Sequence, residues 1–292
     1  MTDPVILDDA AVLQRLNAAD AVEAMRDALV AFHRGQLVSP PRTTAVLTFT
    51  AGRLVGKWYG FRSYAAHVRC EQIVALHTEP DGRLAALARG ASLGAYRTGA
   101  LGGAAVAAMA RPDASTLGVI GSGKQAWTQV WAIAAARALT EVTVASRTPE
   151  NRERFAARIT AELGVPARVV DDPTTAVRDR DIVLIATNSR TPIVEGGWIS
   201  PGTAVTTLGP KQVGAAEFGA DLPAVADVIV TDSPPQLEAM DPPAVISAAR
   251  SLGAVIAGDE PGRTSPDQIT LYESVGLAGT EPFLLARLVG LS

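Results

Sequence analysis

Hydrophobic positions recur with two different spacings in the first third of this chain of 292 residues. Between Asp8 and Gly35 apolar side chains return every three or four positions, which predicts two helices. Alternation typical of strands follows in four segments, 43–49, 53–60, 72–78 and 83–88. The turn Glu79-Pro80-Asp81-Gly82 separates the last two segments and indicates a hairpin. We therefore expect an α+β region at the start of the chain.

Beyond residue 113 the pattern becomes regular. Short apolar runs predict strands at 117–120, 142–145, 167–170, 181–186, 203–208 and 227–231. Helical spacing between them predicts helices at 125–138, 150–163 and 173–178. Alternation of this kind predicts an α/β fold with a doubly wound parallel sheet. We place the domains at 1–112 and 113–261, and expect the final segment, 262–292, to return to the first domain.

A glycine-rich turn joins the first strand of the second domain to its first helix. Gly121, Gly123 and Ala126 form a G-x-G-x-x-A pattern. Gly121 permits the tight turn, Gly123 lets backbone approach a pyrophosphate, and Ala126 lets the helix pack closely on the strand. The helix N-terminus then offers free N–H groups to the anion. The pattern predicts a Rossmann-type dinucleotide site formed by Gly121, Ser122, Gly123, Lys124, Gln125 and Ala126.

The end of the next strand distinguishes the two nicotinamide cofactors. An NAD enzyme usually has an Asp or Glu there to hold the ribose hydroxyls, whereas this chain has Ser146, Arg147 and Thr148. A carboxylate would repel a 2′-phosphate, but Arg147 can bind one with its planar guanidinium and the two hydroxyls can add hydrogen bonds. This favours NADP(H) over NAD(H), the alternative being that Arg147 is a solvated residue after a strand.

Composition narrows the classes of function. The net charge is −4 and no long basic run is present, which argues against a nucleic-acid partner. The N-terminus lacks the features of a signal peptide and no segment resembles a membrane span, so we expect a cytoplasmic protein with no membrane partner. The single cysteine, Cys70, excludes an intrachain disulfide, and no metal-ligand cluster surrounds it, so we expect no metal.

Several separated motifs together resemble the ornithine cyclodeaminase and mu-crystallin family over nearly the whole chain. They are Pro41-Arg42, Gly56-Lys57, Arg97-Thr98-Gly99-Ala100, the turn 121–126, Val230-Thr231-Asp232-Ser233 and Ser274-Val275-Gly276-Leu277-Ala278. The resemblance implies an active site between the two domains and a homodimer built through the sheet of the first domain. It also supports NADP, because Ser146-Arg147-Thr148 is similar to the Asn-Arg-Thr run of mu-crystallin-like ketimine reductases.

The family binds the carboxylate of an α-amino or α-imino acid with cationic side chains. The matching positions are Arg42, Lys57 and Arg97. Arginine offers parallel N–H donors to a carboxylate, and lysine adds a compact charge that can also contact an imine nitrogen. The resemblance therefore implies that Arg42 and Arg97 hold the carboxylate and Lys57 orients the imine. Arg97 could instead face the cofactor phosphates, which Thr98 could also reach.

One position departs from the cyclodeaminases, which carry a catalytic Asp in a late loop. Gly209, Gly214 and Glu217 keep the register of that loop and place Lys211 at the Asp position. An ammonium group cannot accept a proton or stabilise a cationic imine as a carboxylate does, so cyclisation of ornithine with loss of ammonia is not expected. Lys211 is a proton carrier with a lowered pKa, a ligand for an extra acidic group of the substrate, or a solvent-exposed loop residue.

These observations predict an NADPH-dependent oxidoreductase acting on CH–NH or C=N groups, of the ketimine reductase or amino-acid dehydrogenase type. Lys57 and Lys211 are its candidate catalytic groups, and His67 and Arg62 are further candidates near the substrate. One alternative is an ornithine or lysine cyclodeaminase that recycles bound NAD. A second is a non-catalytic protein that binds NADPH or another ligand. The sequence does not identify the side chain of the substrate.

Overall fold

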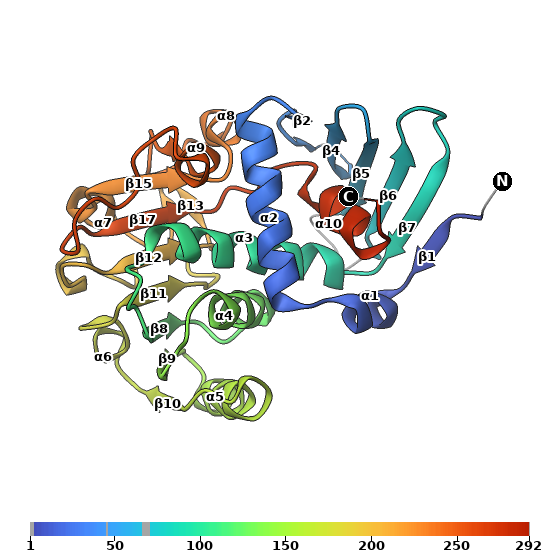
Figure 1. The fold of residues 1–292 in the computed structure, drawn as a ribbon. Helices are drawn as coiled ribbons and strands as arrows, with labels where there is room; N and C mark the ends of the chain where they lie inside the picture. Colours follow the sequence, from blue (N-terminus) through green and yellow to red (C-terminus); the bar gives the residue numbers. More distant parts are fainter. Residues whose placement is uncertain (1–2, 45, 66–70, 292) are drawn as a thin grey trace.

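The computed structural model describes residues 3–44, 46–65 and 71–291, which form two sheets on either side of the long helix α2 (Figure 1). His67 and Cys70 lie outside the described residues. The first part begins with helices α1 (Asp9–Arg15) and α2 (Ala18–His33), as predicted. Asn17 caps α2 by accepting hydrogen bonds from the N–H groups of Ala19 and Asp20.

The first sheet has the order β1-β7-β6-β5-β4-β2, with β3 paired to β4. Its strands are β1 (Val5–Leu7), β2 (Leu37–Val38), β3 (Thr43–Thr44), β4 (Thr48–Leu54), β5 (Trp58–Tyr64), β6 (Ile73–Thr78) and β7 (Leu84–Arg89). The expected strand over 53–60 is wrong, because β4 ends and β5 begins within it, with a turn at residues 55–57. Gly56 is the only residue in 55–57 that favours a turn, so the alternation of apolar and polar residues did not reveal the break between the two strands. Lys57 therefore lies in an exposed turn.

The second sheet is wholly parallel and has the order β10-β9-β8-β11-β12-β17-β15-β16, which confirms the doubly wound fold. Its strands are β8 (Thr116–Ile120), β9 (Glu141–Ala145), β10 (Ala167–Val170), β11 (Ile182–Ile185), β12 (Ala204–Thr207), β15 (Val228–Thr231), β16 (Arg250–Ser251) and β17 (Thr270–Glu273). A separate antiparallel pair is formed by β13 (Lys211–Gln212) and β14 (Ala215–Ala216).

Helices cover both faces of the parallel sheet (Figure 1). They are α3 (Ser92–Met109), α4 (Lys124–Ala136), α5 (Pro149–Leu163), α6 (Pro173–Val177), α7 (Asp221–Val225), α8 (Pro234–Glu238), α9 (Leu252–Ala257) and a short 3-10 turn (Gly196–Trp198). None of the described helices combines the length and apolarity that crossing a membrane would require.

The final segment, 262–292, is divided between the two sheets. Strand β17 lies inside the parallel sheet between β12 and β15, and only α10 (Thr280–Leu288) packs on the first sheet. The return to the first domain that we expected for the whole segment thus holds for its last helix alone. The loop between β17 and α10 passes from one part of the molecule to the other (Figure 1).

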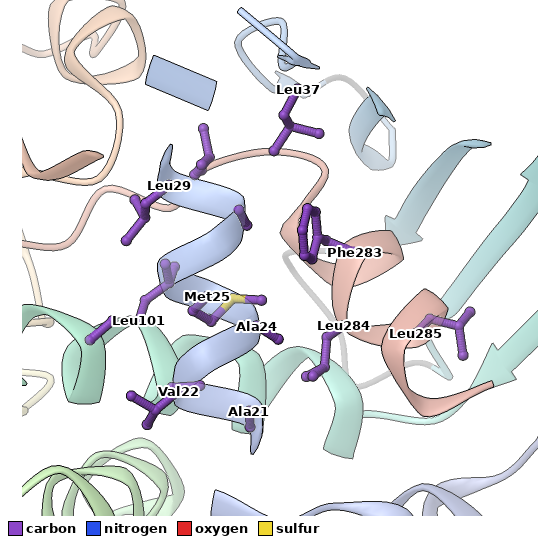
Figure 2. Packing of buried hydrophobic residues seen from close by; sticks show 14 of the residues in the cluster. Ala21, Val22, Ala24, Met25, Leu29, Leu37, Leu101, Phe283, Leu284 and Leu285 are labelled. Carbon is purple, nitrogen blue, oxygen red and sulfur yellow. The ribbon is translucent and has the colours of Figure 1, made fainter. Parts of the chain in front are cut away.

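One hydrophobic core joins the two parts. Figure 2 shows α2, α3 and α10 meeting there through Ala21, Val22, Ala24, Met25, Leu29, Leu101, Phe283, Leu284 and Leu285. The same core contains Trp58 of the first sheet, whose ring lies edge-on to Phe283 at 5.8 Å, and Tyr272 of the second. Shared burial of this kind fixes the two sheets relative to each other.

Candidate active site

A cleft of about 1130 Å³ lies at the carboxyl ends of the central parallel strands. Its walls are the segments that follow β8, β9 and β11, together with Leu208, Gly209 and Pro210 after β12. Strand order reverses between β8 and β11, which is where doubly wound sheets bind ligands. Gly121, Ser122, Gly123, Lys124, Gln125 and Ala126 all line this cleft.

The backbone of the glycine-rich turn has the geometry that a dinucleotide requires. Gly121 has a φ of 117°, and a Cβ there would collide with the carbonyl of Ala186. Helix α4 begins at Lys124, so its first N–H groups open on the cleft. Ser122 and Ser146 join the two loops through a hydrogen bond of 2.8 Å between their hydroxyls.

The ribose end of the cleft contains Ser146, Arg147 and Thr148. Arg147 is exposed and makes no hydrogen bond or ion pair with any other described residue. A second arginine nearby, Arg152, pairs with Asp171 and donates to the carbonyl of Ser146. The ribose end of the cleft thus has one guanidinium, that of Arg147, without a partner among the described residues.

Three guanidinium groups gather where the two parts of the molecule meet. Arg97 on α3 is 6% exposed, and Arg62 on β5 has a side chain that is 13% exposed. Both donate to the same oxygen of Glu281, the bond from Arg62 being 2.6 Å. Arg42, which is exposed, lies beside Arg97, because a Cβ on Gly276 would be 3.0 Å from the Nη2 of Arg42 and 4.0 Å from the Nη1 of Arg97.

Glu281 is fully buried in the first turn of α10. Burial alone would raise the pKa of this carboxyl, but the charges of Arg97 and Arg62 outweigh it and lower the pKa to about 2. Its second oxygen has no hydrogen-bond partner among the described residues. We found no local signal for Glu281 in the sequence, since an acidic residue at the start of a helix is common.

A turn after β17 positions Arg42. Asp232 accepts hydrogen bonds from the backbone N–H groups of Val275 and Gly276 and from the hydroxyl of Tyr272. The carbonyl of Val275 in turn accepts from the Arg42 guanidinium. Asp232 is fully buried and acts as a cap for this loop.

The structure does not bring all of the expected groups together. Lys57 is exposed in the turn between β4 and β5, whereas Arg62, five residues later, occupies the cluster. The hydroxyl of Thr98 donates to the carbonyl of Gly94 within α3, and Thr98 does not line the cleft. Alternation along β5 could have favoured Arg62, because it lies on the face opposite the exposed Tyr59.

Lys211 is only 8% exposed, so the solvent-exposed interpretation of this residue is wrong. Its Nζ donates to the carbonyls of Ser274 at 2.7 Å and Leu208 at 3.3 Å. Burial lowers the pKa of Lys211, although the charges of Glu273 and Glu217 oppose this effect. A lysine with a lowered pKa gives up a proton more readily at neutral pH.

Two buried carboxyls accompany Lys211. Glu217 accepts from the backbone N–H groups of Thr187 at 2.8 Å and Gly209 at 2.6 Å, which fixes the loop at the rim of the cleft. Glu273 has no hydrogen-bond partner for either oxygen among the described residues, and burial raises its pKa to about 7. No described group of three or more His, Cys, Asp or Glu side chains is arranged to hold a metal ion.

A comparison with protein-family models matches residues 2–290 to the ornithine cyclodeaminase/mu-crystallin family. The chain belongs to this family. The resemblance inferred from the separated motifs is thereby confirmed.

Individual members of the family show how the likeness is distributed. A Delta(1)-pyrroline-2-carboxylate reductase of Bacillus cereus is 35% identical over 218 residues, which are 70% of this chain and 66% of that protein, just under two thirds of its length. Ketimine reductase mu-crystallin of Mus musculus is 28% identical over 263 residues, 89% of this chain and 81% of that protein. The solved Delta(1)-pyrroline-2-carboxylate reductase of Thermococcus litoralis, in complex with NADH and L-proline, superimposes with a TM-score of 0.85 at 26% identity, covering 98% and 96% of the two chains.

Proposed function

We propose that this protein is an oxidoreductase that transfers hydride between NADPH and the Cα of an α-imino acid. The observation that carries the proposal is the adjacency of two sites. Residues Leu208, Gly209 and Pro210 line the dinucleotide cleft, and the next residue, Lys211, bonds to Ser274 in the loop that holds Arg42. A carboxylate held by Arg42 and Arg97 would thus lie beside the open end of the cleft.

The protein's contribution to the reaction is orientation and charge. When bound, the cofactor supplies the hydride. Arg42 and Arg97 would hold the carboxylate so that the imine carbon faces the cleft. As that carbon gains hydride, the π electrons of the C=N bond pass to nitrogen, which takes a proton to give the amine. The reverse reaction oxidises the amine.

Lys211 is the group that we propose for the proton. Its lowered pKa and its position next to the residues that line the cleft both support a proton donor that is reprotonated between turnovers. The other account, in which Lys211 binds an acidic group of the substrate, is less well supported, because two backbone carbonyls already accept from its Nζ. Replacing Lys211 with Met should lower turnover sharply and leave NADPH binding intact.

Preference for the 2′-phosphate rests on Arg147. This arginine has no partner among the described residues, and no carboxylate stands at the end of β9 to hold the ribose hydroxyls. The relatives reported above are reductases of pyrroline-2-carboxylate or of ketimines, and one was solved with NADH. They support an NAD(P)-dependent reductase of C=N groups, and Arg147 supports NADPH within that class.

We also propose that two copies of the chain pair through the outer face of the first sheet. Phe49, Tyr59 and Ile73 stand on that face and are 41%, 39% and 40% exposed. Large apolar side chains gathered on one face are typical of a surface covered by a partner. Sedimentation of the wild type and of Phe49→Lys tests this, because a monomeric wild type would contradict it.

The decisive experiment follows the loss of reduced nicotinamide absorbance. Purified protein is mixed with NADPH or NADH and a panel of cyclic imino acids, or with α-keto acids plus amines. We expect oxidation that is much faster with NADPH. Release of ammonia from ornithine without net oxidation would instead support a cyclodeaminase, and tight NADPH binding without any turnover would support a non-catalytic protein.

A further inference from the structure

Arg152 and Asp171 form an ion pair at the ribose end of the cleft, and its two members differ strongly in burial. Both residues line the cleft, Arg152 from the first turn of α5 and Asp171 from the position directly after β10. The side chain of Arg152 is 12% exposed, whereas that of Asp171 is 91% exposed. A largely buried guanidinium needs an anion beside it, but an exposed carboxylate is solvated equally well by water. The pairing therefore stabilises Arg152 more than it stabilises Asp171.

Asp171 satisfies the guanidinium of Arg152 only in part. Its Oδ1 accepts from Nη2 alone, and Nη1 donates to the carbonyl of Ser146 at 3.1 Å. The Nε of Arg152 is buried and has no acceptor among the described residues. Pairs between a guanidinium and an anion are strongest when two parallel N–H groups donate to two oxygens. A pair with one bond and an exposed carboxylate can thus be exchanged for a stronger anion at small cost.

The 2′-phosphate of a dinucleotide is an anion of this kind. The bond to the carbonyl of Ser146 holds Arg152 beside Arg147, the proposed ligand of that phosphate. A phosphate monoester carries a charge of about −1.5 to −2 near neutral pH, and Arg147 supplies a single positive charge. Arg152 can supply the second.

The start of helix α5 adds a further feature that favours an anion. Its N-cap, Thr148, lines the cleft and makes no capping hydrogen bond with its side chain among the described residues. The hydroxyl of Thr148 is therefore available as a donor at the positive end of a helix of 15 residues. Two guanidinium groups, a hydroxyl and a helix N-terminus thus gather at one end of the cleft.

We propose that the 2′-phosphate of NADPH displaces Asp171 from Arg152 on binding, so that Arg147 and Arg152 hold the phosphate together while Asp171 competes with it. This inference rests on the proposed preference for NADPH and adds a second cation and a competing carboxylate to that site. NADH has no 2′-phosphate and leaves the ion pair in place. The carboxylate lowers the affinity for NADPH alone, and it neutralises Arg152 again as the cofactor leaves.

The test is the sign of the change that each substitution causes. Fluorescence titration with NADPH and with NADH compares the wild type, Arg152→Met and Asp171→Asn. We expect Arg152→Met to weaken NADPH binding at least about tenfold, because charge-assisted hydrogen bonds are lost. Asp171→Asn should tighten NADPH binding about three- to tenfold, because the competing charge is gone. The affinity for NADH should stay within about twofold in both variants.

The opposite sign for Asp171 would overturn the inference. Weaker binding of NADPH by Asp171→Asn would mean that this carboxylate only holds Arg152 in place. Unchanged binding of NADPH by Arg152→Met would also overturn it. Arg152→Lys keeps the charge but loses the planar donors, so it should lose less affinity than the Met variant, and it covers the case in which the Met variant folds poorly.

Two matched controls lie on the same helix, α5. Arg154 bonds only within the helix and Glu162 pairs with Arg158, and neither Arg154 nor Glu162 lines the cleft. Arg154→Met and Glu162→Gln therefore make the same changes of net charge outside the cleft. Each should alter the affinity for NADPH less than about twofold. An equal gain in Glu162→Gln and Asp171→Asn would overturn the inference, since it would show a general effect of net charge.

A fragment of the cofactor separates failure of this inference from failure of the preference for NADPH. Calorimetry with adenosine 2′,5′-bisphosphate and with adenosine 5′-phosphate needs no turnover. Binding of the bisphosphate that weakens in Arg147→Met but not in Arg152→Met would overturn this inference alone. Equal binding of the two nucleotides by the wild type would overturn the preference for NADPH as well. Losses in both arginine variants with a gain in Asp171→Asn would support the exchange even in a protein that reduces no imine.

Discussion

The dinucleotide cleft and the arginine cluster are neighbours, but they are built in opposite ways. The cleft is formed by short segments that directly follow strands of one parallel sheet, and glycines and the first N–H groups of α4 line it. The arginine cluster, formed by Arg42, Arg62 and Arg97 around Glu281, draws its side chains from a loop, a strand and two helices that are far apart in the chain. Its geometry depends on long charged side chains and on one buried carboxylate, Glu281.

This difference determines how each region should respond to change. A site built of backbone is altered by changing its shape, and single polar substitutions at its rim adjust affinity and selectivity. A site built of mutually paired charges responds strongly to removal of one member, because the remaining charges stay buried without a partner. Four substitutions test this contrast.

Replacing Arg97 with Met should have the largest effect. It removes a proposed ligand of the substrate carboxylate and leaves the buried Glu281 with Arg62 alone, so kcat/KM should fall by on the order of 100-fold or more, from a loss of about 3 kcal/mol. Steady-state kinetics gives this value, and fluorescence titration gives the affinity for NADPH, which should stay within about threefold. An equal loss of NADPH affinity would assign Arg97 to the cofactor phosphates.

Replacing Glu273 with Gln should stabilise the protein in a manner that depends on pH. Burial raises the pKa of Glu273 from its ordinary 4.5 to about 7, so the unfolded chain ionises this group first and folding stability is lost as the pH rises from about 4.5 through 7. Glutamine stays neutral throughout. Urea unfolding should show a gain of up to about 3 kcal/mol at pH 8 and almost none near pH 4. A gain of the same size at both pH values would show that ionisation is not its cause.

Replacing Arg147 with Met should alter cofactor choice within the cleft. Loss of a charged hydrogen-bond donor costs about 1.5–3 kcal/mol, so affinity for NADPH should fall about 10- to 100-fold while affinity for NADH stays the same. Arg154→Met is the control, since Arg154 lies on α5, is exposed and bonds only within its own helix. Similar losses in both variants would indicate a general effect of charge.

Replacing Lys57 with Met should have the smallest effect. The family resemblance implies that Lys57 orients the imine of the substrate. Its side chain, however, is exposed in the turn after β4 and makes no hydrogen bond with Arg42, Arg62 or Arg97 among the described residues. We expect kcat/KM to change by less than about threefold, as for most surface substitutions. A 100-fold loss of kcat/KM with an unchanged melting temperature would show that Lys57 acts in the active site.

The sequence by itself determined the features that depend on residues close together in the chain. Regular alternation from residue 117 onward predicted the parallel sheet, and the pattern at Gly121, Gly123 and Ala126 predicted the cleft, because strand, turn and helix are local and their side-chain periods differ. The separated motifs together identified the family. Arg42 and Arg97 were recognised only by that resemblance, since an isolated arginine carries no local signal.

Only the tertiary structure decided which charges meet. Arg62 and Glu281 are separated by 219 positions, yet one hydrogen bond of 2.6 Å joins them once α10 packs on the first sheet. Lys211 is buried in β13, although solvent exposure was one of the alternatives that the sequence left for it, and the hairpin turn places Lys57 at the surface. Pairing between charges arises from long-range contacts, so the local periodicity of the sequence cannot show which charged side chains meet.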